Sequence, residues 1–278
     1  MDIHKPKPFH NLREFASEVL IVVVGVAIAL GGEQAVEWLT WQHRAQDARE
    51  AIAIELGEDI GQGEARVRVG ACYAAELDRL AKTIDAAAAS GRLPPIAAFR
   101  TPPLWTWDTD GWRNAQASGA AAHMRSDEQH DIGAGYSFIA TLRDTNDAER
   151  DPWTRLSTLA GPGRGFGGEE AIVMRYALAQ SRRLNSLMVL GGLRIRQAAD
   201  IPHIRFDPEI AANMSASPDP RDPCAIAGAS AALDGPVPPD YGGQFNAADI
   251  AALIARVKAT GWVAFGRNAP KEAVHGHP

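Results

Sequence analysis

Four residues with metal-ligand chemistry lie close together near the middle of the chain: His123, Asp127, His130 and Asp131. Imidazole nitrogens and carboxylate oxygens are common ligands of zinc and related metals. However, Ser126 is expected to begin a helix, so His123 and Asp127 would not share a helical face despite lying four residues apart. Asp127 is also explained by its place in a first helical turn, where a carboxylate complements the helix dipole. We therefore predict no metal or other cofactor, and the alternative hypothesis is a membrane-tethered, metal-dependent enzyme that uses these four residues.

Four tryptophans form a second candidate site. Trp105 and Trp107 lie in a proline-rich loop at residues 91–109, whereas Trp112 and Trp153 lie in or near predicted helices. Such side chains could line a pocket or a ledge for a partner, but indoles more commonly bury themselves and fix a loop to a core. Both interpretations stay open, and these four are the predicted binding residues.

The glycine-rich stretch at residues 161–168 resembles a phosphate-binding loop only in composition. A dinucleotide loop follows a strand and leads into a helix whose N-terminus accepts anions. Here a predicted helix precedes the stretch, and Glu169 and Glu170 follow it with charges that would repel phosphate. We predict a flexible connector. Motifs of the Gly-x-Ser-x-Gly, His-Glu-x-x-His and Walker types are absent from the sequence, so no catalytic activity is identified.

The only two cysteines, Cys72 and Cys224, are predicted to form a disulfide. Both follow the apolar segment described next, and an oxidising compartment would permit their pairing. The alternative is a buried thiol at Cys72 and an unrelated loop cysteine at Cys224.

An apolar run extends from Val19 to Gly32. If it crosses a membrane, it decides in which compartment the residues described above lie. Glu18 and Glu33 would lie ~22 Å apart on a helix, compared with a hydrocarbon core of ~30 Å, so each carboxylate must reach toward an interface. Trp38 and Trp41 follow at the depth that indoles favour. We predict an uncleaved transmembrane anchor at residues 15–41, with a cleaved signal peptide and a core helix of a soluble protein as the two alternatives.

The charges around the anchor predict its orientation. Lys5, Lys7 and Arg13 precede it, and Glu33 and Glu37 follow it, so the N-terminus is expected in the cytoplasm and the bulk of the chain outside. For a bacterium this places the protein in the inner membrane with a periplasmic domain. The formal net charge of -6 gives no basic field for nucleic acid, so we predict no such partner.

The fold is predicted to be mainly α, with the transmembrane helix continuing into an antiparallel helical bundle. Apolar residues recur at three-four spacing through residues 42–89, where several glycines predict a weak point near 57–63. Further helices are expected at 126–145, 146–159 and 169–199. The predicted organisation is a cytoplasmic arm at 1–14, the anchor at 15–41, a helical periplasmic domain at 42–200, a Pro-rich segment at 201–246, a last helix at 247–262 and a tail at 263–278.

The expected partners are membrane lipid, another envelope protein and a second copy of the chain. Gly25 and Ala29, and Gly31 and Ala35, are four residues apart, a spacing that lets helices approach closely in lipid and predicts a weak homodimer. The function predicted from these features is an interaction, sensing or scaffolding role for a membrane-anchored helical domain.

Three stretches carry a family resemblance: EVLIVVVGVAIAL at 18–30, AQDAREAIAIEL at 45–56 and WRNAQASGAAAHM at 112–124, followed by Gly135 and Tyr136. Together they resemble an uncharacterised family of bacterial single-pass membrane proteins, known only as a domain of unknown function. The chain departs from it at residues 31–33, Gly-Gly-Glu, where many such proteins carry longer polar side chains. The resemblance implies an anchored helical domain and implies no activity.

Overall fold

The computed structural model describes residues 12–99, 101–102 and 105–196, together with 204, 248, 251, 252 and 255. Most of these residues are helical, which confirms a mainly α protein with a long apolar helix near its N-terminus. The chain forms two compact units, Met1–Asp47 and Ala48–Pro278. The predicted Pro-rich segment, last helix and tail lie outside the described residues apart from the single positions named above, as does most of the predicted arm.

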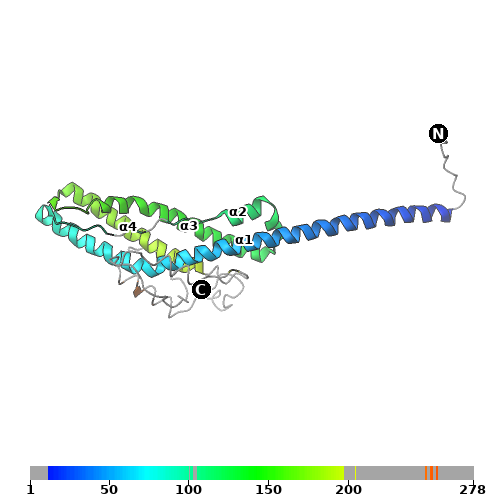
Figure 1. Cartoon of the computed structure of the whole chain (residues 1–278), viewed down its shortest axis with the longest axis horizontal. Coiled ribbons are helices and arrows are strands. Elements are labelled where there is room, and N and C mark those ends of the chain that lie inside the picture. The colour runs from blue at the N-terminus through cyan, green and yellow to red at the C-terminus, as the bar shows by residue number, and fades with distance from the viewer. Residues whose placement is uncertain are drawn as a thin grey trace, which may run out of the picture. The chain divides into compact units, whose positions relative to one another are not determined.

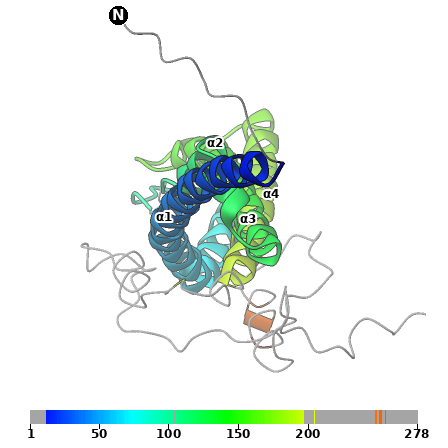
Figure 2. The same ribbon diagram turned by 90° about the vertical axis from the view of Figure 1, so that its right-hand side faces the viewer.

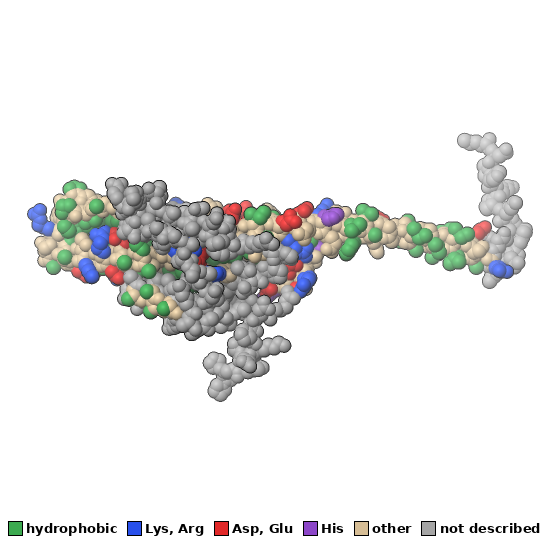
Figure 3. All heavy atoms as spheres, turned by 60° about the horizontal axis from the view of Figure 1, so that its bottom comes forward, with side chains coloured by type: hydrophobic (Ala, Val, Ile, Leu, Met, Phe, Trp, Pro, Cys, Tyr) green, Lys and Arg blue, Asp and Glu red, His purple; other side chains and the backbone are tan. Residues whose placement is uncertain are grey.

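Helix α1 (Leu12–Ser90) contributes to both units and begins with the apolar run (Figure 1). This helix is long and apolar enough to cross a membrane, and its most apolar stretch buries no residue. Its valine, isoleucine and leucine side chains are exposed along the run, as the space-filling view also shows (Figure 3). A core helix of a soluble protein would bury these side chains, and no residue of this stretch is buried within the chain.

The C-terminal end of α1 is fixed by a glycine. Ser90 is its last residue, and Gly91 takes a φ of 70°, a left-handed conformation that stops a helix at little cost when the residue has no Cβ. Strand β1 (Arg92–Leu93) then pairs antiparallel with β2 (Arg164–Gly165). The glycine-rich stretch is therefore part of a small sheet, and the prediction of a flexible connector there is wrong.

Three further helices follow in the second unit. Helix α2 (Asp110–Ala117) leads through a 3-10 turn, η1 (Ala120–His123), to α3 (Ser126–Ser157), which begins at the predicted residue. The residue before it, Arg125, makes no side-chain capping hydrogen bond. The predicted break after 145 is also absent, because α3 continues through a buried Pro152 while its apolar side packs into the core. Helix α4 (Gly168–Ile195) then covers most of the last predicted helix of this domain.

The ion pairs between these helices show their directions. Asp85 pairs with Arg175 and Asp78 with Arg182, so α1 and α4 run antiparallel. Arg49 pairs with Glu128 and Arg66 with Glu149, so α1 and α3 run in the same direction, unlike neighbours in an antiparallel bundle.

The segment between α1 and α2 explains why α1 and α3 are parallel. We call residues 94–109 the return segment, since it leads from the end of α1 back toward the start of α3. Ile96 bridges to Gly161 near one end of α3, and the Thr106 carbonyl accepts a hydrogen bond from Gln62 toward the other. Sixteen extended residues span up to ~55 Å, about the length of 35 helical residues, which is enough to return along the helices.

Close contact between α1 and α4 depends on glycines. A Cβ on Gly63 would lie 2.6 Å from Ile195 Cγ2 and 3.2 Å from Gly192 Cα. A Cβ on Gly192 would in turn meet the Gly63 carbonyl oxygen and lie 2.8 Å from Val67 Cγ2. Helix α1 continues through residues 57–63, where Gly63 lets it pack closely against Gly192 of α4. The predicted weak point stays a prediction.

Candidate functional site

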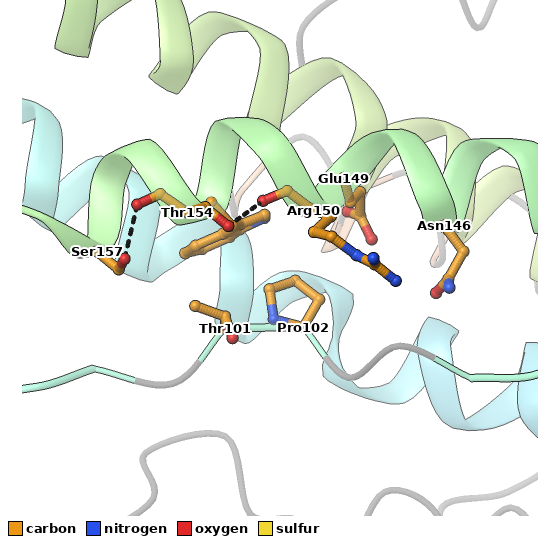
Figure 4. Close-up of a pocket in the computed structure, with 8 residues that line it drawn as sticks. Thr101, Pro102, Asn146, Glu149, Arg150, Thr154 and Ser157 are labelled. Atoms are coloured by element: carbon orange, nitrogen blue, oxygen red, sulfur yellow. Dashed lines mark hydrogen bonds between the residues drawn. The ribbon is translucent and has the colours of Figure 1, made fainter.

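A pocket of about 340 Å³ lies between α3 and the return segment (Figure 4). Thr101 and Pro102 line it from the return segment, and α3 supplies the other lining residues: Asn146, Glu149, Arg150, Trp153, Thr154 and Ser157. Helical spacing explains this second set, since residues three or four apart occupy one face of a helix. The pocket therefore has one wall of a single helix and one of extended chain.

A buried ion pair lies next to this pocket, and one of its two members, Glu149, is a lining residue. Glu149 is 2% exposed and accepts a hydrogen bond of 2.6 Å at Oε1 from Nη2 of Arg66, which is 1% exposed. Burial raises the pKa of the Glu149 carboxyl, and the Arg66 guanidinium opposes that shift. The second carboxylate oxygen, Oε2, has no hydrogen-bond partner, nor do Nε and Nη1 of Arg66. Three polar atoms of the pair are therefore buried without a hydrogen-bond partner, and each such atom lowers the free energy of unfolding.

Aromatic rings hold this ion pair in position. The Arg66 guanidinium carbon lies 4.9 Å from the centroid of the Tyr73 ring, and Tyr73 meets Trp153 edge to face at 5.9 Å between centroids. The ring centroids of Phe99, in the return segment, and Trp153 lie 6.4 Å apart. Since Glu149 and Trp153 are one helical turn apart on α3, the packing of the indole also places the carboxylate.

The polar groups of the α3 wall mostly present oxygen lone pairs to the pocket. The Thr154 hydroxyl donates to the Arg150 carbonyl at 2.8 Å, and the Ser157 hydroxyl donates to the Thr154 carbonyl at 2.7 Å (Figure 4). The amide nitrogen of Asn146 donates to the Trp105 carbonyl at 3.3 Å. With these hydrogens committed to backbone oxygens, the hydroxyls remain available as acceptors.

A separate acidic cluster joins α1 to the start of α2. Both carboxylate oxygens of Glu55 accept from the Gly111 N–H, at 3.1 and 3.0 Å. One turn later Asp59 is 1% exposed, and its Oδ2 has no hydrogen-bond partner. Burial, reinforced by the charges of Glu55 and Asp108, raises the pKa of Asp59 to about 8. Burial and the neighbouring Glu55 also raise the pKa of the Tyr136 hydroxyl.

The four predicted tryptophans do not share one site. Trp153 alone among them lines the pocket described above. Trp107 is buried and lies 6.4 Å from Trp105 between ring centroids, both in the return segment. The Trp112 indole nitrogen lies 3.9 Å from the position of a Cβ on Gly133, which places it against α3.

The predicted metal ligands are not brought together either. His123 ends η1, and Asp127, His130 and Asp131 follow in the first turns of α3. The Asp127 carboxylate pairs with Arg125 at 2.5 Å and also accepts from the Glu128 N–H. Within the part of the chain that the structure describes, no group of three histidine, cysteine or acidic side chains could hold a metal ion.

Sequence reasoning did not identify Arg66, Glu149 or Asp59 as site residues. A signal for Glu149 was present, because the buried face of α3 follows a three-four spacing in which polar Asn146 and Glu149 occupy positions expected to be apolar. Polar residues on a buried stripe indicate a buried polar contact or a site. The partner, Arg66, lies 83 residues away, and no local pattern identifies it.

The predicted disulfide is only half within the described residues. Cys72 is half-buried against the hydrophobic core, and the described part of the chain contains no free cysteine. Cys224 lies outside the described residues, so the Cys72–Cys224 pair stays a prediction.

We expect purified, denatured but unreduced protein to show no free thiol, because the two cysteines would be bonded. Thiol alkylation followed by mass measurement checks this. Reduction should then add two alkyl groups and lower the free energy of unfolding, by roughly 4 to 5 kcal/mol in the chain-entropy model. Replacing both cysteines by serine gives the matched control, whose stability should not respond to reductant. Two alkylated thiols without reduction would contradict the pairing.

No family model, no curated protein and no solved structure matches this chain. The family resemblance drawn from the sequence therefore stays a prediction.

Proposed function

We propose that this chain is a single-pass membrane protein whose helical second unit has a sensing or interaction role outside the cytoplasm. The observation that carries the proposal is the fully exposed apolar stretch of α1. An exposed apolar surface of this length is unfavourable in water, and a lipid bilayer removes it from water without any protein partner. The helix continues without a break to Ser90, which favours an anchor over a signal peptide that is cut away.

The charges on either side of the apolar stretch support the orientation. Arg13 lies before it, and Glu33 and Glu37 lie within the exposed helix after it. On the positive-inside rule this places residues 1–14 in the cytoplasm and the second unit beyond the membrane. For a bacterial cell we propose the inner membrane and the periplasm.

The second unit supports a binding role through the pocket beside Glu149. Its α3 wall combines the exposed side chains of Arg150, Thr154 and Ser157 with the Trp153 indole, a mixture of polar and aromatic groups that suits a ligand or a partner segment. Another envelope protein and a second copy of the chain are the proposed macromolecular partners, alongside membrane lipid.

A fusion of alkaline phosphatase after Pro278 should be active in intact bacteria, because the enzyme matures only when exported. The same fusion placed after Asn11 should be inactive, which provides the control. The full-length product should also remain in the membrane pellet after alkaline extraction. Phosphatase activity only for the Asn11 fusion would contradict the orientation, and release of a shortened chain would show a cleaved signal peptide instead of an anchor.

A further inference from the structure

We propose that the acidic cluster of Glu55, Asp59 and Asp108 is a pH-sensitive latch that holds the start of α2 against α1 and releases it as the pH rises. The inference rests on the proposed sensing role, for which the release of α2 would be the signal. Three features lead to it: the few contacts that hold α2, the charges that meet at the cluster, and the buried residues on either side of α2.

Few contacts hold α2 in place. Among its eight residues, all of them described, only Ala115 is buried, and the Thr109 side chain does not cap its first turn. Instead, the Glu55 carboxylate of α1 accepts from the Gly111 N–H and complements the positive end of the helix dipole. Helix α2 lies at the surface of the second unit (Figure 2). A short surface helix with so little buried area opens at a low free energy.

A buried carboxyl group lies next to this contact. Asp59 follows Glu55 by one turn of α1, and the backbone N–H of Asp108 donates a hydrogen bond to its carboxyl group. The carboxyl oxygen Oδ2 is buried without a hydrogen-bond partner. On the α3 side, the Tyr136 hydroxyl oxygen lies 2.9 Å from the position of a Cβ on Gly111. Asp59 therefore lies where α1, the return segment and the first turn of α2 come together.

Among the described residues, the charges that act on Asp59 are negative. Glu55 and the exposed Glu58 contribute from α1 and Asp108 from the return segment, while the Tyr136 hydroxyl, whose pKa is raised, stays neutral. Arginines of the surrounding elements pair with other carboxylates: Arg66 with Glu149, Arg113 with Asp110 and Arg143 with Asp144. An ionised Asp59 would thus meet like charges in a place that excludes water, and release of α2 would relieve this repulsion.

Proton binding by Asp59 sets the direction of the switch. Burial and the neighbouring carboxylates raise its pKa to about 8 in the closed state, whereas in the open state the proton leaves near the ordinary value of 3.8. The closed state therefore binds more protons between these values. The ratio of open to closed molecules should rise about tenfold per pH unit up to about pH 8 and be constant above it.

Buried residues on either side of α2 confine the movement. Before α2, Trp107 is buried and the Thr106 carbonyl accepts a hydrogen bond from Gln62 of α1. After it, Ala120 and Ala121 of η1 are buried. The segment that the latch releases is therefore residues 108–117, with a fixed point at each end.

Hydrogen–deuterium exchange on the full chain in detergent micelles, between pH 5 and 9, tests the proposal. Each rate is divided by the intrinsic rate at the same pH, which gives a protection factor. The amides of residues 114–118 should be less protected than those of α4 at 174–190 at every pH, because α2 opens alone. Their protection should fall about tenfold per unit up to pH 8 and then level off. Protection of α2 that does not change with pH, or that equals the protection of α4, would overturn the latch.

Variants identify the titrating group. Asp59→Asn should make the protection of α2 independent of pH, because asparagine is a neutral analogue of the protonated acid. Asp108→Asn keeps the backbone contact but removes one repelling charge, so the total loss of protection should shrink about tenfold for each unit by which the pKa of Asp59 falls. This second variant keeps the test open if Asp59→Asn does not fold. Asp151→Asn, at an exposed position of α3, is the matched control and should leave the profile unchanged.

An unchanged pH profile in folded Asp59→Asn, or in Asp108→Asn, would overturn the assignment of the latch to this cluster. These results are separable from the membrane proposal, since the phosphatase fusions report orientation whether or not α2 is released.

Discussion

Replacing Gly192 by alanine should destabilise the second unit by ~2 kcal/mol or more. The added methyl group would be forced against the carbonyl oxygen of Gly63 and would lie 2.8 Å from Val67 Cγ2. In a helix, alanine is more favourable than glycine by ~1 kcal/mol. Overpacking a buried contact costs ~1–3 kcal/mol. The cost should be at the upper end here, because a backbone atom cannot move aside as a side chain can. Denaturant unfolding followed by tryptophan fluorescence measures the change.

Gly133→Ala is the matched control for that experiment. Gly133 also lies inside a helix, yet its added Cβ would lie 3.9 Å from the Trp112 indole nitrogen, an ordinary contact distance. We expect this variant to be up to ~1 kcal/mol more stable than the natural chain, because only helix propensity changes. If both substitutions changed the stability equally, the close approach of α1 and α4 would be contradicted.

The second large effect concerns Asp59 and pH. The folded chain holds a proton on Asp59 up to about pH 8, whereas the unfolded chain releases it near 3.8. The folded state therefore binds more protons between these values, and the contribution of Asp59 to stability falls as the pH rises through that window and is constant above it. The accumulated loss at pH 8 is on the order of 5 kcal/mol, because each of the roughly four pKa units between the two states corresponds to ~1.4 kcal/mol.

Asp59→Asn should remove this loss, because asparagine is a neutral analogue of the protonated acid. The variant should be more stable than the natural chain at pH 8, and the difference should shrink toward pH 4. Thermal unfolding midpoints across that range test both statements, and Asp151→Asn, at an exposed position of α3, gives the control for a change of net charge. A constant difference across the range would contradict the shifted titration.

The parts of the fold that sequence predicted well are those with local causes. The apolar run follows from composition alone, the end of α1 from Gly91, and the start of α3 from the residues around Ser126. Pro152 misled the same reasoning, because a local rule predicts a break while the burial of Trp153 and neighbouring side chains keeps α3 continuous.

The candidate site was less predictable because its parts come from distant stretches of chain. Tryptophans were selected by residue type, and only Trp153 lines the pocket. Arg66 looks like a charged residue on a surface face of a helix, and only the direction of α3 relative to α1 brings it to Glu149. The direction of α3 depends on how the return segment packs along the helices. The spacing of residues in the sequence does not predict this packing.

The parallel arrangement of α1 and α3 has a consequence for how the chain folds. Most helical proteins fold fast because their contacts join residues close in sequence. Here the ion pairs of α1 with α3, with α4 and with Arg196 just after α4 join residues from 79 to 132 positions apart. Each requires closure of a long loop, so we expect slow folding for a helical protein. During synthesis α1 emerges first. Its charged side chains that are buried in the folded protein, such as Arg66, stay hydrated until their partners on the later helices have been synthesised.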